Sequence, residues 1–155
     1  MSSAFVREQD GPDLTEDLPD RPVSPHPNLV TSEGLAAIVA EVEQARAALA
    51  AAREAEDREA GARALRDLRY WQHRHSTAET MPPPPDRETV HFGSTVTILR
   101  DDGRRIRYRI VGEDEADPAR GTLSWVSPLA RAMLGQGVGT VVEAGQHEAE
   151  IVAIG

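Results

Sequence analysis

The fold of the C-terminal half is decided by the stretch Tyr108-Arg-Ile-Val-Gly-Glu-Asp-Glu-Ala-Asp-Pro-Ala-Arg-Gly121, followed by Ser127-Pro-Leu-Ala-Arg-Ala-Met-Leu-Gly135. The first stretch opens on alternating apolar and charged side chains, the pattern of a half-buried strand. Pro118 and Gly121 then bracket a turn. The second stretch begins with Ser and Pro, which favour the N-cap and first position of a helix, and ends on a Gly that favours its C-terminal stop. Strand, turn and short helix therefore follow one another here.

Further strands are predicted on both sides of these stretches. Residues 95–100 and 104–111 alternate in polarity and are joined by Asp101-Asp102-Gly103, which is a hairpin turn signal. Residues 138–143 and 148–154 have the same pattern around a turn at Gly145. The C-terminal domain, residues 88–155, is therefore expected to be a small twisted antiparallel sheet with one short helix against it, an α+β module.

Residues 29–81 follow the period of a helix instead. Thr31 or Ser32 can serve as an N-cap, and apolar residues then recur at spacings of three and four: Leu35, Ile38, Val42, Ala45 and Leu49, with a second series at Ala62, Leu65 and Leu68. This narrow seam is typical of a coiled coil. Because the segment is nearly symmetric about residue 56, it predicts an antiparallel helical hairpin with its tip between Glu54 and Glu59. Each arm holds about 22 residues, or ~33 Å.

Proline-rich segments separate the predicted parts. Residues 82–87 contain Pro82-Pro83-Pro84-Pro85, which ends the hairpin and forms a stiff linker. Residues 1–28 carry six acidic residues, five prolines and almost no apolar periodicity: Glu8, Asp10, Asp13, Glu16, Asp17 and Asp20, with Pro12, Pro19, Pro22, Pro25 and Pro27. This composition predicts a disordered acidic arm. An acidic peptide that docks on a basic partner is the functional alternative.

Composition excludes several classes of function. The 17 basic residues stand against 26 acidic ones, a net charge of −9, so independent binding of duplex DNA is not expected. No Cys is present, which excludes disulfides, thiolate metal sites and Cys nucleophiles. No apolar run has the ~18 residues of a membrane span, and no secretory signal is visible. We expect a cytoplasmic monomer that does not bind membranes.

The two C-terminal stretches, with Gly93-Ser-Thr-Val-Thr-Ile98 and Val138-Gly-Thr-Val-Val-Glu143, resemble the C-terminal domain of the bacterial Gre-type transcript-cleavage and elongation factors. The segment Leu29-Val-Thr-Ser-Glu-Gly-Leu35 is similar to the start of that family's coiled coil. The resemblance implies an N-terminal antiparallel coiled coil and an FKBP-like C-terminal domain. It also implies a partner, bacterial RNA polymerase, whose secondary channel the family enters with its coiled coil. In the family, acidic residues at the tip help to hold a Mg²⁺ beside the polymerase's own carboxylates.

Two departures from the family pattern narrow the prediction. The hairpin is shorter than the family's, and the tip motif of the family is absent. The chain is in this respect closer to the regulator-of-nucleoside-diphosphate-kinase type of Gre homologue. We therefore expect a regulator of transcription elongation that has no catalytic or metal-binding residues and no cofactor of its own, apart from a Mg²⁺ that could be shared with the polymerase. A full transcript-cleavage factor is the first alternative, and a prolyl isomerase or chaperone is the second.

The tip is the first candidate site, with Glu54, Glu56, Asp57 and Glu59 as its acidic residues. Two such acids could complete a metal site shared with a partner. They are also what a solvated helical turn contains, and Arg53, Arg58 and Arg63 interleave with them. A solvated turn, contact with polymerase and metal-assisted cleavage are the three interpretations.

Two further sites lie in the C-terminal domain. Ser127, Pro128 and Arg131 begin the short helix, and the resemblance places the polymerase-docking surface there; a plain helix start is the structural interpretation. The second is a basic stripe on one strand, formed by Arg104, Arg105, Arg107 and Arg109. It is either a solvated face balanced by Glu113, Asp114, Glu115 and Asp117, or a contact for an acidic partner or RNA. It has no interleaved aromatics to stack on bases.

Overall fold

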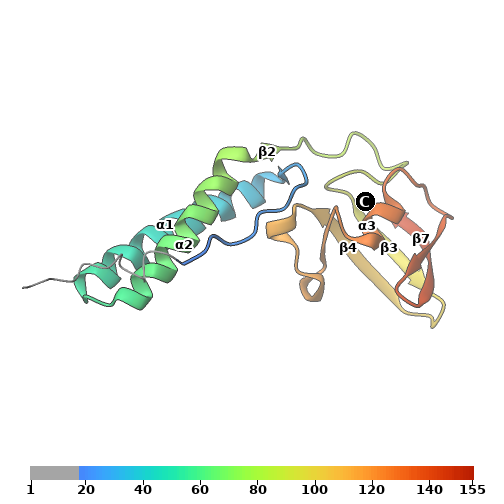
Figure 1. Ribbon diagram of the computed structural model, residues 1–155. Helices are drawn as coiled ribbons and strands as arrows, with labels where there is room; N and C mark the ends of the chain where they lie inside the picture. The colour runs from blue at the N-terminus through green and yellow to red at the C-terminus, as the bar shows by residue number, and fades with distance from the viewer. Residues whose placement is uncertain (1–17) are drawn as a thin grey trace, which may run out of the picture. The chain divides into compact units, whose positions relative to one another are not determined.

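The computed structural model describes residues 18–155 (Figure 1). Within them the chain forms two compact units. The hairpin unit consists of residues 18–25 and 38–77, and the sheet unit consists of residues 26–37 and 78–155. None of the helices in residues 18–155 is both long and apolar enough to cross a membrane.

The hairpin unit is built on two helices, α1 at Ser32–Glu54 and α2 at Arg58–Thr77, although residues 32–37 of α1 group with the sheet unit. They contain 23 and 20 residues, close to the predicted arm length. Their shared core holds Val42, Ala45, Leu49, Ala64 and Leu68, with Leu65 and Trp71 packed against it. The predicted seam is therefore confirmed for Val42, Ala45, Leu49, Leu65 and Leu68, whereas Leu35, Ile38 and Ala62 are not part of this cluster. Because alanine fills much of it, the core is thin and lined by small side chains.

The sheet unit contains a five-stranded sheet in the order β5-β4-β3-β7-β6. Its strands are β3 at Thr95–Arg100, β4 at Arg105–Val111, β5 at Thr122–Ser124, β6 at Val141–Ala144 and β7 at His147–Ile154. The β3–β4 hairpin turns at the predicted glycine: Gly103 has φ 86° and donates its N–H to the Arg100 carbonyl at 2.9 Å. A left-handed φ of this kind favours glycine.

One strand departs from the antiparallel prediction. β5 pairs with β4 in parallel, with Ile110 opposite Leu123. The chain first reverses through two 3₁₀ turns, η1 at Glu113–Glu115 and η2 at Pro118–Arg120, and so re-enters beside β4 in the same direction. The sheet is therefore mixed, although its four other strands pair antiparallel.

The short helix α3, Pro128–Met133, covers one face of the sheet. Ala130 and Met133 on this helix are fully buried, as are Val96, Ile98 and Ile110 on the strands. The complete core cluster is Val90, Val96, Ile98, Ile110, Leu123, Ala130, Met133, Val142, Ala144, Ala149 and Ile151. The single helix and the strand alternation were both predicted correctly. The opposite face of β4 carries the arginines.

The disordered arm predicted over residues 1–28 is wrong for residues 18–28. Arg69 Nε lies 2.6 Å from Asp20 Oδ1, and Arg69 Nη2 donates to the Leu18 carbonyl at 3.1 Å. Arg21 pairs with Asp67 at 3.3 Å, and its guanidinium lies 4.0 Å from the centre of the Tyr70 ring. These ion pairs and the cation–π contact offset the conformational entropy that residues 18–28 lose when they become ordered. The composition of the segment does not show these contacts. Residues 1–17, with the other five acids, lie outside the described part.

The boundary between the hairpin and the sheet domain also differs from the predicted position at residues 82–87. Residues 26–37 and 78–87 group with the sheet unit. Two short parallel strands, β1 at Leu29–Val30 and β2 at Glu79–Thr80, pair with each other within this unit. Asp86 accepts hydrogen bonds from the N–H groups of Glu88 and Thr89 at 2.9 and 3.2 Å. The proline-rich segment is therefore part of the sheet unit, since side-chain bonds and strand pairing hold both of its flanks.

Candidate functional site

The tip of the hairpin is a turn of three residues, Ala55 to Asp57, between α1 and α2. The N–H of Asp57 bonds to the Ala52 carbonyl at 2.8 Å, and that of Glu56 bonds to the Arg53 carbonyl at 3.2 Å. This pair of bonds is the Schellman arrangement, which requires a left-handed residue at the position of Glu56. Glu56 has φ 54° and is the one residue other than glycine with positive φ in residues 18–155. A glutamate thus occupies a position that favours glycine.

Asp57 starts the second helix at the same turn. Its Oδ1 accepts a hydrogen bond from the N–H of Ala60 at 3.0 Å, as an N-cap side chain does. One of the four predicted tip carboxylates, that of Asp57, therefore stabilises the start of α2. It explains how two helices can be joined by so short a turn, because both helix ends are satisfied locally.

The four tip acids are all exposed: Glu54, Glu56, Asp57 and Glu59. The structure brings them to one end of the hairpin, as the sequence predicts, but it does not gather them into a metal site. Across residues 18–155, no group of three or more His, Cys, Asp or Glu side chains is placed to hold a metal ion. The donor set therefore does not fit an independent Mg²⁺ site.

The predicted docking residues lie at the start of α3. Ser127 is the N-cap: its Oγ accepts from the N–H of Ala130 at 3.3 Å and donates to the Ser124 carbonyl at 2.7 Å. Pro128 occupies the first helical position, where a missing N–H costs nothing. Pro128 and Arg131 are exposed, while Ala130 between them is buried. Because residues three apart share a helix face, Pro128 and Arg131 present one small surface that the N-cap holds in place.

Glu115, an acid expected to balance the arginine stripe, instead binds the start of α1; we call this contact the Glu115 clasp. Glu115 Oε2 accepts from the N–H groups of Thr31 and Gly112, each at 3.0 Å, and Glu115 Oε1 accepts from the Thr31 hydroxyl. Thr31 is also the N-cap of α1, since its Oγ1 accepts from the Gly34 N–H at 2.9 Å. No local pattern could have linked Thr31 with a residue 84 positions away.

Two glycines make room for this clasp. A Cβ on Gly34 would lie 2.1 Å from the Glu115 carboxyl carbon, and a Cβ on Gly112 would lie 2.3 Å from the Leu29 carbonyl oxygen. Both distances are shorter than any real Cβ contact. The glycine in the segment Leu29–Leu35 and the one in the motif Tyr108–Gly121 are thus required by the same close approach.

The basic stripe is paired less than the sequence suggested. Arg104 turns toward Asp102, with Nε 3.7 Å from Oδ2, and Arg109 Nη2 lies 3.5 Å from Glu33 Oε2. A hydrogen bond from its own backbone, followed by the charge of Arg109, lowers the pKa of Glu33. Arg105 and Arg107 are exposed, and within residues 18–155 neither has an ion-pair partner.

Two of the acids expected to balance this stripe bind other residues. Glu115 forms the clasp, and Asp117 pairs with Arg120 at 3.7 Å. The interpretation of a self-neutralised strand face is therefore wrong for Arg105 and Arg107.

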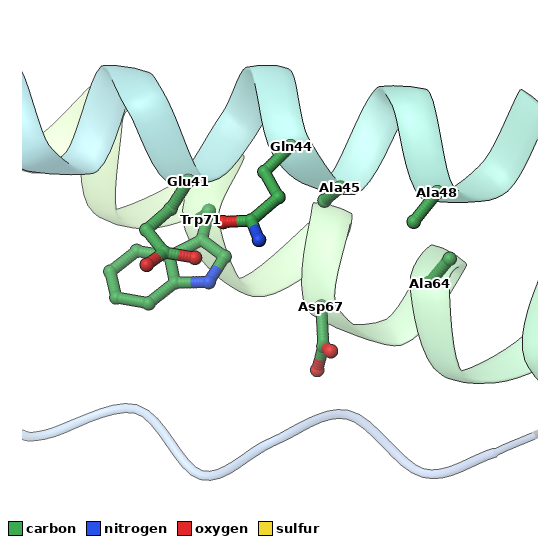
Figure 2. A pocket seen from close by; sticks show the side chains of 7 residues that line it. All are labelled: Glu41, Gln44, Ala45, Ala48, Ala64, Asp67 and Trp71. Atoms are coloured by element: carbon green, nitrogen blue, oxygen red, sulfur yellow. The ribbon is translucent and has the colours of Figure 1, made fainter.

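A groove of about 320 Å³ lies in the hairpin unit (Figure 2). Small side chains from both helices form much of it, and the Trp71 ring lies at one end. Its lining is Glu41, Gln44, Ala45, Ala48, Ala64, Asp67 and Trp71. Its two carboxylates come from Glu41 and Asp67, and Asp67 is already paired with Arg21.

Comparison with known proteins assigns a relationship to the C-terminal half. Residues 84–155 match the family model described as transcription elongation factor, GreA/GreB, C-terminal. Transcription elongation factor GreB of Neisseria meningitidis serogroup B is 39% identical over 95 residues, which cover 57% of this chain and 58% of the relative. Transcription elongation factor GreA of Paracoccus denitrificans is 42% identical over 84 residues, covering 51% of this chain and 54% of that protein. The matched regions thus span 58% and 54% of the length of these two relatives.

Solved structures give a likeness that extends over more of the chain. GreA factor homolog 1 of Thermus thermophilus is 21% identical, with a TM-score of 0.42, and the alignment covers 84% of this chain and 99% of that one. GreA/GreB from Nitrosomonas europaea is 19% identical, with a TM-score of 0.40, and the alignment covers 81% and 97% of the two chains.

Proposed function

We propose, because residues 84–155 match the family model of the GreA/GreB transcription elongation factor C-terminal domain, that this protein regulates transcription elongation by binding bacterial RNA polymerase. The family match over the sheet unit is the observation that supports this proposal most strongly. The hairpin that precedes the sheet unit is the second support, since the resemblance identified from the sequence implies one at this position.

The sheet unit is the docking part in this proposal, and the surface of Pro128 and Arg131 is its contact. The Ser127 cap holds the first turn of α3 rigidly, so little order has to be gained on binding. Both side chains are exposed and can be buried by a partner without disturbing the core under α3. In this proposal the hairpin approaches the secondary channel of the polymerase.

The hairpin tip would act by charge and shape rather than by chemistry of its own. Its four carboxylates are exposed and one of them caps a helix. In this proposal the protein is a regulator and not an enzyme. One copy acts on one polymerase in the cytoplasm, and it needs no cofactor.

Stimulation of transcript cleavage is the second candidate, and the exposed carboxylate of Glu56 at the apex favours it. Any Mg²⁺ would then have to be held largely by the polymerase, because the tip lacks a complete donor set. A prolyl isomerase is not favoured. The rings of Tyr108 and Trp125 pack against the core cluster, so they are not free to line a proline pocket.

The docking surface can be tested by co-purification of the full chain with bacterial RNA polymerase core enzyme. Arg131→Gln combined with Pro128→Ala should weaken the affinity about tenfold or more, because two exposed contacts at the centre of the surface are removed. Arg120→Gln combined with Pro83→Ala removes the same two side-chain types elsewhere on the sheet unit and should bind as the unchanged protein does. Equal binding by both double variants would refute this docking surface, and no binding by the unchanged chain would refute the function.

The role of the tip is tested in a stalled elongation complex. Glu56→Gln with Asp57→Asn keeps the shape of the turn and removes two charges. The regulator proposal predicts an altered elongation rate and no stimulated cleavage by either protein. Cleavage that the unchanged chain stimulates and this variant does not would establish the second candidate instead.

A further inference from the structure

The face of the sheet opposite α3 carries a row of cations beside a row of hydroxyls. We call Arg105, Arg107 and Arg109 of β4, with Thr95 and Thr97 of β3, the arginine face. The antiparallel register places Thr97 opposite Arg107 and Thr95 opposite Arg109. Directly opposed residues point to the same side of a sheet, and the alternate residues of both strands point into the core.

Two of these guanidinium groups are available to a ligand. Arg105 and Arg107 are exposed and, among residues 18–155, have no ion-pair partner. They are two positions apart on one strand, so their Cα atoms lie roughly 7 Å apart in a line. Arg109 continues the line and pairs with Glu33 at 3.5 Å, with 39% of its side chain exposed. The hydroxyls of Thr95 and Thr97 make no hydrogen bond to any residue in the described range.

Negative charge on the same side of the sheet lies on other strands. Glu150 pairs with Leu99, which in turn pairs with Arg105, so all three point to one side. Glu148 and Glu143 follow on β7 and β6, and all three glutamates are exposed. Strands are about 4.8 Å apart, so the acidic strands lie roughly 10 to 15 Å from β4. The acids thus lie on the row of Arg105 and beyond it, whereas the row of Arg107 and Thr97 continues to Ala153 on β7.

We propose that the arginine face binds single-stranded RNA through its phosphate backbone. A line of cations one strand wide matches one phosphate chain, whereas a duplex laid on it would also cover the acidic strands and be repelled. The threonine hydroxyls can both donate to and accept from a ribose 2′-hydroxyl, which DNA lacks. No aromatic side chain of β3 or β4 points to this face, so binding is independent of base sequence and strongly dependent on salt.

This binding does not rest on the proposed function, because it needs no polymerase. It adds a ligand to the sheet unit at a face different from the surface of Pro128 and Arg131. RNA binding by the isolated chain and polymerase binding can therefore fail separately.

The test is fluorescence anisotropy of a labelled oligouridine with the full chain at several salt concentrations. Arg105→Gln with Arg107→Gln should reduce the slope of log affinity against log salt by about 1.4, since each phosphate contact on a single strand contributes about 0.7. At about 50 mM salt the affinity should fall about tenfold or more. Arg105→Lys with Arg107→Lys should retain most of the binding and its salt slope, because lysine also neutralises phosphate.

A matched control keeps the test specific to this face. Arg46→Gln with Arg120→Gln removes the same charge from two exposed arginines, one on α1 and one on η2, and should change the affinity by no more than about twofold. Equal weakening by both double variants would show that only net charge matters and would overturn the proposal.

Two other ligands test the choice of RNA. Oligodeoxyuridine of equal length should bind about fivefold more weakly, the effect of about one lost hydrogen bond, and Thr97→Val should narrow that difference. Polyglutamate of equal charge should compete poorly. If the DNA bound as tightly as the RNA, or if polyglutamate displaced the RNA at equal charge, the face would be a general anion surface or a docking site for an acidic peptide, and the proposal would be wrong.

Discussion

The hairpin unit and the sheet unit are stabilised in different ways. The sheet core buries branched side chains completely, with Ile98, Ile110 and Ile151 at 0% exposure, whereas the hairpin core retains 9% exposure at Leu49 and at Leu68. Alanine fills much of the space between the helices. Helices form their backbone bonds locally, while strands need partners far along the chain. A thin core therefore suffices for the hairpin, and the sheet unit depends on tight packing.

Truncation of a core side chain should lower the free energy of unfolding more in the sheet unit than in the hairpin unit. Ile98→Ala should lower the free energy of unfolding by about 3 to 4 kcal/mol, because it leaves a cavity in a fully buried site. Val42→Ala, at 7% exposure in the hairpin, removes less buried volume and should cost about 1 to 2 kcal/mol. Chemical denaturation followed by circular dichroism measures both. Equal costs would contradict the proposed difference between the two cores.

Substitutions of glycine test the same comparison, with expected changes in stability of intermediate size. Gly112→Ala should destabilise the protein by about 2 kcal/mol or more, because its Cβ would meet the Leu29 carbonyl oxygen at 2.3 Å and the backbone must shift. Gly61→Ala is the matched control within α2, where the nearest atom to a new Cβ is 3.8 Å away. This change should stabilise the hairpin by up to about 1 kcal/mol, since alanine favours a helix. Thermal unfolding would show the two shifts in opposite directions.

The smallest effects are expected at the hairpin tip. Glu56→Gly should raise stability by about 0.5 to 1 kcal/mol, because φ 54° carries no penalty for glycine. Asp57→Ala should lower stability by about 1 kcal/mol through loss of the bond to the Ala60 N–H. Amide hydrogen exchange in residues 50–62 would detect both changes. A destabilising Glu56→Gly change would contradict the left-handed turn.

Prediction from sequence succeeded where the signal is local. The a/d spacing of Val42, Ala45 and Leu49 identified the hairpin, and the Ser127-Pro128 pair identified the start of α3. The exposed position of the tip acids also followed from the symmetry of the segment. These features depend on neighbours within a few residues, which the order of the sequence contains directly.

Prediction failed where the partner is distant. Acidic and proline-rich composition suggested disorder up to residue 28, yet Arg69 binds Asp20 across 49 positions and Arg21 binds Asp67 across 46. Counting acids near the arginine stripe suggested neutralisation, yet Glu115 turns to Thr31 and leaves Arg105 and Arg107 exposed. Charge counting fails because an ion pair depends on which side chains meet in space.

The amino-acid sequence by itself therefore determined which segments become helix and strand, where the chain turns, and to which family its C-terminal half is related. Only the tertiary structure decided which carboxylate meets which backbone N–H, and that β5 joins the sheet in parallel. It also decided that, within residues 18–155, Arg105 and Arg107 have no ion-pair partner beside a row of threonine hydroxyls. The physical reason is the separation along the chain over which each interaction acts. Backbone propensity and capping act over one or two turns, whereas ion pairing, strand register and burial are set by residues that folding brings together from distant parts of the chain.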